Sequence, residues 1–240
     1  MSNELRLRKL TARDCQDRDI ARLRRNLLDW FSRHRRDLPW RRNITPYRVL
    51  VSEIMLQQTV MSAVAPRFER WMQRFPDLGA LARASERDVL REWEGLGYYA
   101  RARNLRLTAQ IVRREHGGRL PAEYAALRKL PGIGDYTASA ILSLVHDQPY
   151  PVLDANVRRV MMRYRERETW NRAVERETRA FLGAAIAPAT RERSTRGSWN
   201  LARSCAGRAR RSASRAPWRR TAALARRGER RRSRRSESAR

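Results

Sequence analysis

Residues 130–138 read LPGIGDYTA, a run in which two glycines flank a single apolar residue between two helical patterns. Glycines here permit positive φ and a close backbone approach, while Ile133 can anchor the turn in the core. The helix that starts after Gly134 then presents free backbone N–H groups, which favour a phosphate. A Gly-x-Gly pair alone also occurs in ordinary tight turns, but the nine-residue pattern predicts a helix-hairpin-helix element that binds DNA.

The chain on both sides of this hairpin has the apolar spacing of helices, and no stretch alternates convincingly as a half-buried strand would. Pro39 breaks the chain after the first helix, Ser85 and Asp88 are placed to cap another, and Gly117-Gly118 stops a third. The pattern therefore predicts an all-α protein. We expect helices over residues 17–35, 46–55, 60–75, 78–82, 86–93, 98–116, 122–129, 136–145, 155–164 and 170–186.

The charge of the chain is strongly positive. The formal net charge is +29, and residues 191–240 supply +15 of it through 18 Arg against 3 Glu, which leaves +14 for the rest. A foldable region this basic favours a polyanionic partner such as nucleic acid. A basic surface that is merely solvated would have the same composition.

Residues 191–240 contain no Ile, Val, Met, Phe or Tyr. Such a segment cannot bury enough apolar surface to offset the entropy of ordering it, so we expect a disordered Arg-rich C-terminal tail. Residues 1–16 are expected to be a flexible N-terminus, and residues 17–190 the folded region.

The two cysteines, Cys15 and Cys205, lie too far apart in the sequence to indicate a disulfide framework or a metal site. The N-terminus lacks an apolar signal region, and no run approaches the ~20 apolar residues of a membrane span. We expect a soluble, cytoplasmic protein with no membrane partner.

Two acidic residues lie in motifs that suggest chemistry. Glu53 stands among apolar residues and two amides in VSEIMLQQT, residues 51–59, and Asp154 stands at a helix start in PVLDANVRRV, residues 151–160. Taken singly, Glu53 could be a surface glutamate on a helix and Asp154 an ordinary N-cap.

Together with the hairpin, the two carboxyl groups suggest cleavage of an N-glycosidic bond. That reaction needs an acid to protonate the leaving base and a negative charge to stabilise the cationic sugar, which is the logic of glycoside hydrolysis. A Glu in apolar surroundings can hold a proton near neutral pH, while a capping Asp stays ionised. The fold must bring both into one cleft.

Five motifs now give a clear family resemblance. In chain order they are LPWR (38–41), SEIMLQQT (52–59), GLGYYARARN (95–104), LPGIGDYTA (130–138) and LDANV (153–157). Together they resemble adenine DNA glycosylases, over about residues 20–185. The resemblance implies the helix-hairpin-helix DNA glycosylase fold, related to endonuclease III, with two helical subdomains and a cleft between them. One subdomain would be residues 41–153 and the other residues 17–40 plus 154–190.

The resemblance also implies a function: removal of adenine mispaired with 8-oxoguanine or guanine in double-stranded DNA, by a monomer. Glu53 would protonate adenine and later act on the attacking water. Asp154 would face the developing oxocarbenium ion, and Asn156 would orient Asp154. Residues that wedge into the stack or line the adenine pocket would be Gln58, Tyr98, Arg41 and Leu56, although core packing is the simple alternative for Leu56 and Tyr98. The DNA backbone would be held by Gly132, Ile133, Gly134 and Thr137.

Tyr136 separates two related activities. Endonuclease III-like members have a lysine in the hairpin where this chain has Tyr136, and that amine forms a Schiff base which supports strand cleavage. We therefore expect base removal without an efficient lyase step. An endonuclease III-like glycosylase/lyase and an inactive DNA-binding remnant remain the alternatives.

The chain departs from the family in its last fifty residues. Most members carry a four-iron–four-sulfur cluster on cysteines spaced C-x6-C-x2-C-x5-C, and usually a further domain that reads 8-oxoguanine. Here the region holds only Cys205, and iron–sulfur clusters need thiolate ligands. We therefore expect no cofactor and no metal in this chain.

A shifted reading frame would explain this departure. With GC-rich codons, the frame displaced by two bases from Ser194 onward can read FNQGLMELGALVCRPRAPQCVACPLAADC, which has the cluster spacing. Its four cysteine codons arise where Cys205, Ser212, Arg215 and Thr221 each precede an alanine. We predict that the gene's nucleotides across codons 185–225 contain this pattern. Its absence from both other frames would rule the hypothesis out.

Overall fold

The computed structural model describes residues 22, 25–26, 29, 32–34 and 36–186. The chain divides into two compact units, residues 36–154 and residues 1–35 together with 155–240. The predictions of a flexible N-terminus at 1–16 and of a disordered, out-of-frame tail at 191–240 concern residues outside the described part.

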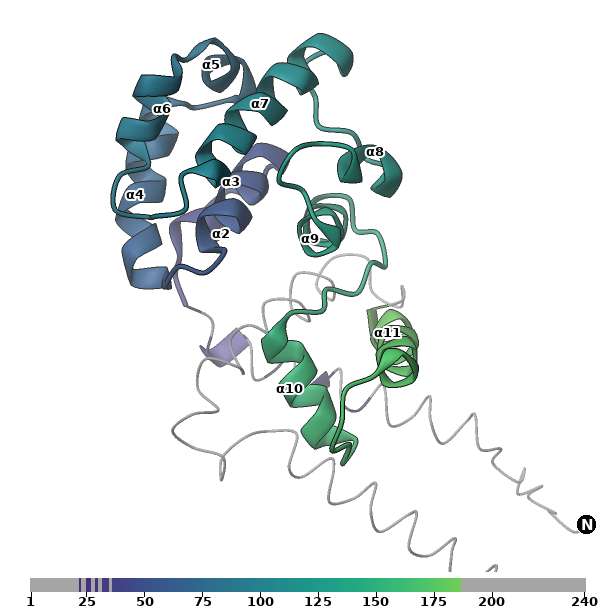
Figure 1. The fold of residues 1–240 in the computed structure, drawn as a ribbon. Helices are drawn as coiled ribbons and strands as arrows, with labels where there is room; N and C mark the ends of the chain where they lie inside the picture. The colour runs from purple at the N-terminus through teal and green to yellow at the C-terminus, as the bar shows by residue number, and fades with distance from the viewer. Residues whose placement is uncertain (1–21, 23–24, 27–28, 30–31, 35, 187–240) are drawn as a thin grey trace, which may run out of the picture. The chain divides into compact units, whose positions relative to one another are not determined.

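The unit of residues 36–154 is built entirely from helices and loops (Figure 1), as predicted. Its helices are α2 (Pro39–Arg42), α3 (Pro46–Leu56), α4 (Met61–Arg74), α5 (Leu78–Arg83), α6 (Glu86–Glu92), α7 (Ala100–Glu115), α8 (Tyr124–Arg128) and α9 (Asp135–Val145). Helix α5 packs on α7, and α6 packs on the same helix. Helix α8 lies against α9, which follows it through the predicted hairpin.

Helix α3 is the centre of this unit, because it contacts α2, α4, α7 and α9. Its start is set locally: Pro46 occupies the first turn, and the Thr45 hydroxyl accepts a hydrogen bond from the backbone N–H of Arg48 at 3.2 Å. All residues from 49 to 55 are buried. A helix buried over such a length receives most of its stability from tertiary packing.

An aromatic cluster around Trp71 of α4 forms part of the core. The Trp71 ring lies edge-to-face against Phe75 and Trp93, with centroids 4.9 and 5.4 Å apart. The Trp71 indole N–H donates to the Tyr47 hydroxyl at 3.0 Å, which in turn donates to the Phe75 carbonyl at 2.8 Å. Burial raises the pKa of Tyr47, so the phenol stays protonated and keeps this chain of bonds.

Two element boundaries differ from the sequence-based predictions. The helix expected from Tyr98 begins at Ala100, because Tyr98 adopts a left-handed φ of 47° and belongs to the preceding turn. Pro39 does more than break the chain: it opens the short helix α2, since proline fits the first helical position. The expected cap is confirmed, because the Ser85 hydroxyl accepts from the Asp88 N–H at 3.1 Å.

The described part of the other unit contains α10 (Ala155–Tyr164) and α11 (Arg172–Ile186), close to the expected ranges. Tyr164 and Phe181 bring their rings to 5.9 Å between centroids. The Arg179 guanidinium donates to Glu175 at 2.9 Å and lowers the pKa of that carboxyl group. The helix expected over residues 17–35 lies partly outside the described residues; those described within it, 22, 25–26, 29 and 32–34, are helical.

The expected subdomain limits, 41–153 and 17–40 plus 154–190, lie near the observed division after residues 35 and 154. The cleft expected between the subdomains stays a prediction. No helix in the described ranges combines the length and the apolar character that crossing a bilayer requires.

Candidate functional site

The hairpin joins α8 to α9 and is held from three sides. Ile133 is 2% exposed and anchors the turn in the core, as predicted. The Thr108 hydroxyl on α7 donates to the Pro131 carbonyl at 2.8 Å. The Arg128 guanidinium donates to the Ile133 carbonyl at 2.7 Å. The turn is therefore fixed to its own unit before any ligand arrives.

Gly132 and Gly134 play different parts in this turn. Gly132 has a φ of +76°, and a Cβ there would stand 3.1 Å from the Cβ of Asn104. Gly134 is extended, with φ −84° and ψ 177°, and a Cβ there would meet no atom within 4 Å. Gly132 is thus required by conformation and by space, whereas Gly134 leaves open room in front of α9.

The first turn of α9 has the form of an anion site. Its N-cap residue is Gly134, which has no side chain to cap the helix. The first backbone N–H groups of a helix have no helical acceptor, so they can turn to an anion. Thr137 is 1% exposed, and its predicted contact with DNA stays a prediction. Asp135 at the same turn is paired with Arg128 at 2.6 Å.

Glu53 lies inside the protein, on α3. Only 2% of its surface is exposed, so the interpretation as a surface glutamate is wrong. Its helix packs against α9, the helix that opens at the hairpin. Burying a carboxylate is costly unless it is paired or protonated. The role of Glu53 as an acid stays a prediction.

Asp154 and Asn156 lie where the chain passes from one unit to the other. Asp154 is half-buried and directly precedes α10, at the end of the unit that holds Glu53. Asn156 is half-buried in α10 and belongs to the other unit. Their approach to Glu53 stays a prediction.

Gln58 and Tyr98 lie at the tips of two turns, and both are exposed. Gln58 follows the end of α3 and Tyr98 precedes α7, with φ values of 55° and 47°. The Arg101 side chain joins the two turns, because it donates to the carbonyls of Gln57 and Gly97. The structure thus brings together these two predicted residues.

The sequence did not indicate a role for Arg101. It stands in the motif of residues 95–104, but it is one of 54 basic residues in an arginine-rich chain, so its type carried no signal. Only the contacts across the fold distinguish it from its exposed neighbour Arg103.

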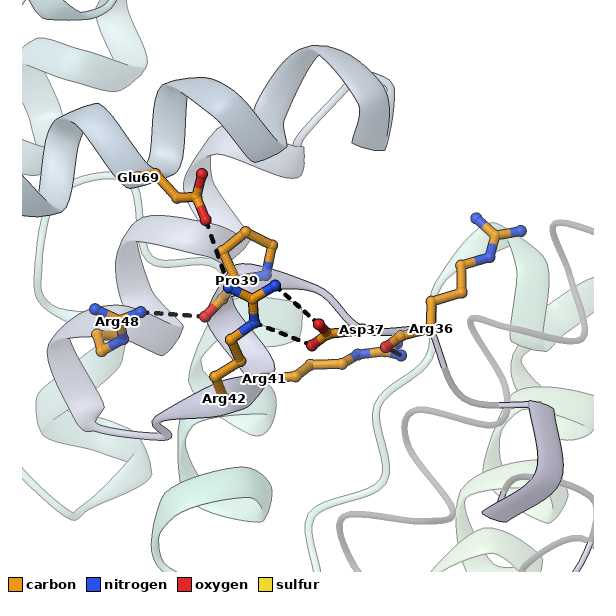
Figure 2. Close-up of polar contacts among 7 residues, drawn as sticks. All are labelled: Arg36, Asp37, Pro39, Arg41, Arg42, Arg48 and Glu69. Carbon is orange, nitrogen blue, oxygen red and sulfur yellow. Dashed lines mark hydrogen bonds and ion pairs between the residues drawn. The ribbon is translucent and has the colours of Figure 1, made fainter.

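Arg41 lies on α2, beside a group of charged residues shown in Figure 2. Its Nη1 donates to the Arg36 carbonyl at 3.3 Å. The Arg42 guanidinium lies between Asp37 and Glu69 and pairs with them at 2.8 and 3.7 Å. The bond to Asp37 raises the pKa of Arg42. The Arg36 carbonyl thus binds Arg41, whereas side-chain carboxylates bind Arg42.

Leu56 is the last residue of α3 and is half-buried. It comes three positions after Glu53 on the same helix, so one face can present both side chains. Among the described residues, no three His, Cys, Asp or Glu side chains are grouped as metal ligands.

Comparison with known proteins adds the family. Residues 51–183 match the family model described as "HhH-GPD superfamily base excision DNA repair protein". The chain is 46% identical over 156 residues to an adenine DNA glycosylase of Rattus norvegicus, which covers 61% of this chain and 30% of the relative. It is 42% identical over 165 residues to an adenine DNA glycosylase of Mycolicibacterium smegmatis, which covers 68% and 51% respectively. The chain thus spans about half or less of the length of these relatives.

Solved structures agree on the fold. A thermostable thymine-DNA glycosylase superposes with a TM-score of 0.71 at 24% identity, over 80% of this chain and 88% of that one. A non-covalent complex of endonuclease III with DNA gives 0.63 at 20% identity, over 78% and 84%. The predicted helix-hairpin-helix glycosylase fold is confirmed.

We predict that Gly132→Ala destabilises the protein, by about 1–2 kcal/mol, because alanine resists a left-handed φ. The added methyl group would also press on Asn104. Chemical denaturation of the full chain measures the change. Gly134→Ala is the matched control, since its methyl group enters open space at an ordinary φ. Equal stability of the two variants would contradict the assignment of Gly132.

Proposed function

Because the chain belongs to the HhH-GPD superfamily of base excision DNA repair proteins, we propose that it is a DNA N-glycosylase. Its substrate would be adenine mispaired with 8-oxoguanine or guanine in double-stranded DNA. The similarity to adenine DNA glycosylases from a mammal and from bacteria supports this choice of base.

The observation that carries the proposal is the buried Glu53 on a helix packed against the hairpin helix. A carboxyl group that is withdrawn from water favours its protonated form. It can then donate a proton to the leaving base, and afterwards accept one from the attacking water. An apolar helix that carries a single acid next to a phosphate-binding turn suits this chemistry.

The base must first leave the duplex, because its reacting atoms are unreachable inside the stack. The exposed tips at Gln58 and Tyr98 supply side chains that can enter the gap. The first-turn N–H groups of α9 would hold a backbone phosphate meanwhile. Arg41 and Leu56 would line the adenine pocket, and Asp154, oriented by Asn156, would stabilise the cationic sugar.

The main alternative is a glycosylase/lyase like endonuclease III. Tyr136 disfavours it, since this half-buried side chain at the start of α9 has no amine to form a Schiff base. A second alternative is a catalytically inactive DNA-binding remnant.

The iron–sulfur cluster implied by the resemblance does not fit this chain. The sequence holds two cysteines, and a cluster of this type takes four thiolates. We propose that the chain binds DNA without a cluster. The family match also ends at residue 183, before the Arg-rich segment begins.

We predict that Glu53→Gln lowers the single-turnover rate of adenine excision about 10²- to 10⁴-fold, because the amide cannot transfer a proton. The assay uses the full chain and an 8-oxoguanine:adenine duplex. Duplex affinity should stay within about threefold, since phosphate contacts dominate it.

Glu115→Gln is the control, because this carboxylate is exposed at the end of α7. It should excise adenine at the unmodified rate. Equal activity of Glu53→Gln and the unmodified chain would contradict the role of Glu53. Binding without excision in every protein would favour the remnant.

We predict further that borohydride traps no covalent adduct between the unmodified chain and a substrate duplex. Tyr136→Lys places an amine at the first turn of α9 and should produce such an adduct, which electrophoresis under denaturing conditions would detect. The variant serves as the positive control. A strong adduct with the unmodified chain would favour the lyase alternative.

A further inference from the structure

The carbonyl groups at the end of α3 find their donor in a side chain from another helix. The Nη1 group of Arg101 on α7 donates to the carbonyl of Ile54 at 2.9 Å and to that of Met55 at 3.2 Å, and it also donates to the carbonyl of Gln57. The last carbonyls of a helix lack helical partners and carry partial negative charge, so a cation there is favourable. Arg101 thus caps the helix that carries Glu53.

The other end of the same guanidinium holds the turn before α7. Its Nη2 group donates to the carbonyl of Leu96 at 2.8 Å and to that of Gly97 at 3.0 Å. The Gly97 carbonyl also accepts from the Trp93 indole N–H at 3.1 Å, and Trp93 is fully buried. The turn is therefore fixed to the core on one side and to Arg101 on the other.

Both turns end in residues whose backbone conformation is unfavourable for an L-residue. Gln58 and Tyr98 have φ values of 55° and 47°, without being glycine. Such conformations persist only where the surroundings impose them, and they gather at functional sites. Arg101 bonds to the residue directly before each of them, so it is placed to impose both.

Large apolar side chains at Tyr98 and at Val60, two positions after Gln58, are exposed to solvent. Tyr98 is 66% exposed and Val60 is 67% exposed, although most large apolar side chains of this unit are buried. The Arg101 guanidinium lies 5.7 Å from the centre of the Tyr98 ring and 5.3 Å from that of Trp93. Exposed aromatic and apolar side chains on rigid turns are suited to stacking against bases.

We infer that Arg101 is a positioning residue that locks the Gln58 and Tyr98 turns into one rigid probe for the base stack. The inference rests on the proposed function, since it assigns the insertion step of that reaction. Arginine is required because its planar guanidinium presents donors on two sides. A lysine would reach one turn and leave the other unheld.

The test separates insertion from chemistry. A duplex with 2-aminopurine in place of the target adenine reports unstacking by its rise in fluorescence when protein binds. Arg101→Met and the milder Arg101→Lys, as full chains at saturating concentration, should reduce this rise and the excision rate from a paired duplex by about tenfold to a hundredfold. Duplex affinity should change by about threefold or less.

Excision from an adenine that is already unpaired provides the second readout. Both Arg101 variants should process it at close to the unmodified rate, because Glu53 remains in place. Arg103→Met is the matched control, since Arg103 lies two positions along α7 and pairs with Glu86 at the surface. It should behave like the unmodified chain in every assay.

Several outcomes would overturn the inference. One is an unchanged fluorescence rise in the Arg101 variants, and another is the lack of any rise with the unmodified chain. An equal loss of excision from paired and unpaired adenine would show that Arg101 only supports the fold. A normal rise without excision in the unmodified chain would refute the proposed function and leave the role of Arg101 standing.

Discussion

The central constraint in this structure is that a deeply buried helix must end where its carbonyl groups can still be satisfied. Helix α3 is enclosed by α2, α4, α7 and α9, and it places Glu53 in the interior. Its C-terminal carbonyls receive the Arg101 guanidinium from α7. Burial lowers the pKa of Arg101, but arginine keeps its charge in proteins, so the cap persists. One side chain thereby links the helix of the candidate acid to two exposed turns.

The hairpin raises the corresponding question for the N-terminus of α9, where backbone N–H groups rather than carbonyls lack helical partners. Helix α9 begins after Gly134, which has no side chain to cap its first N–H groups, while Ile133, Thr108 and Arg128 fix the turn before it. The backbone carbonyls bonded by Thr108 and Arg128 stabilise the turn, whereas the first N–H groups of α9 can bind a ligand. Because α3 and α9 pack together, the helix start proposed to hold a phosphate and the buried carboxyl group belong to one compact unit.

The chain is a member of the HhH-GPD superfamily that covers only part of the length of its adenine glycosylase relatives. The family match ends at residue 183, and the composition changes from mixed to arginine-rich shortly after it. The whole chain holds two cysteines and cannot supply four thiolates. Under the proposed function, contact with DNA would therefore come from the hairpin, the exposed turns and basic charge. Attraction of that last kind weakens steeply with salt.

The sequence by itself determined the helical class, the hairpin and the caps. These follow from local chemistry: two glycines around Ile133, Thr45 before Pro46, Ser85 before an acidic turn, and apolar spacing in between. It also selected Glu53, since an acid in an apolar run is unusual. Only the tertiary structure decided that Glu53 is buried, that Tyr98 lies outside α7, and that Arg101 joins the turns at Gln58 and Tyr98, which are 40 positions apart in the sequence. Those properties depend on which helices meet, and a residue's type or its neighbours in the chain do not encode that.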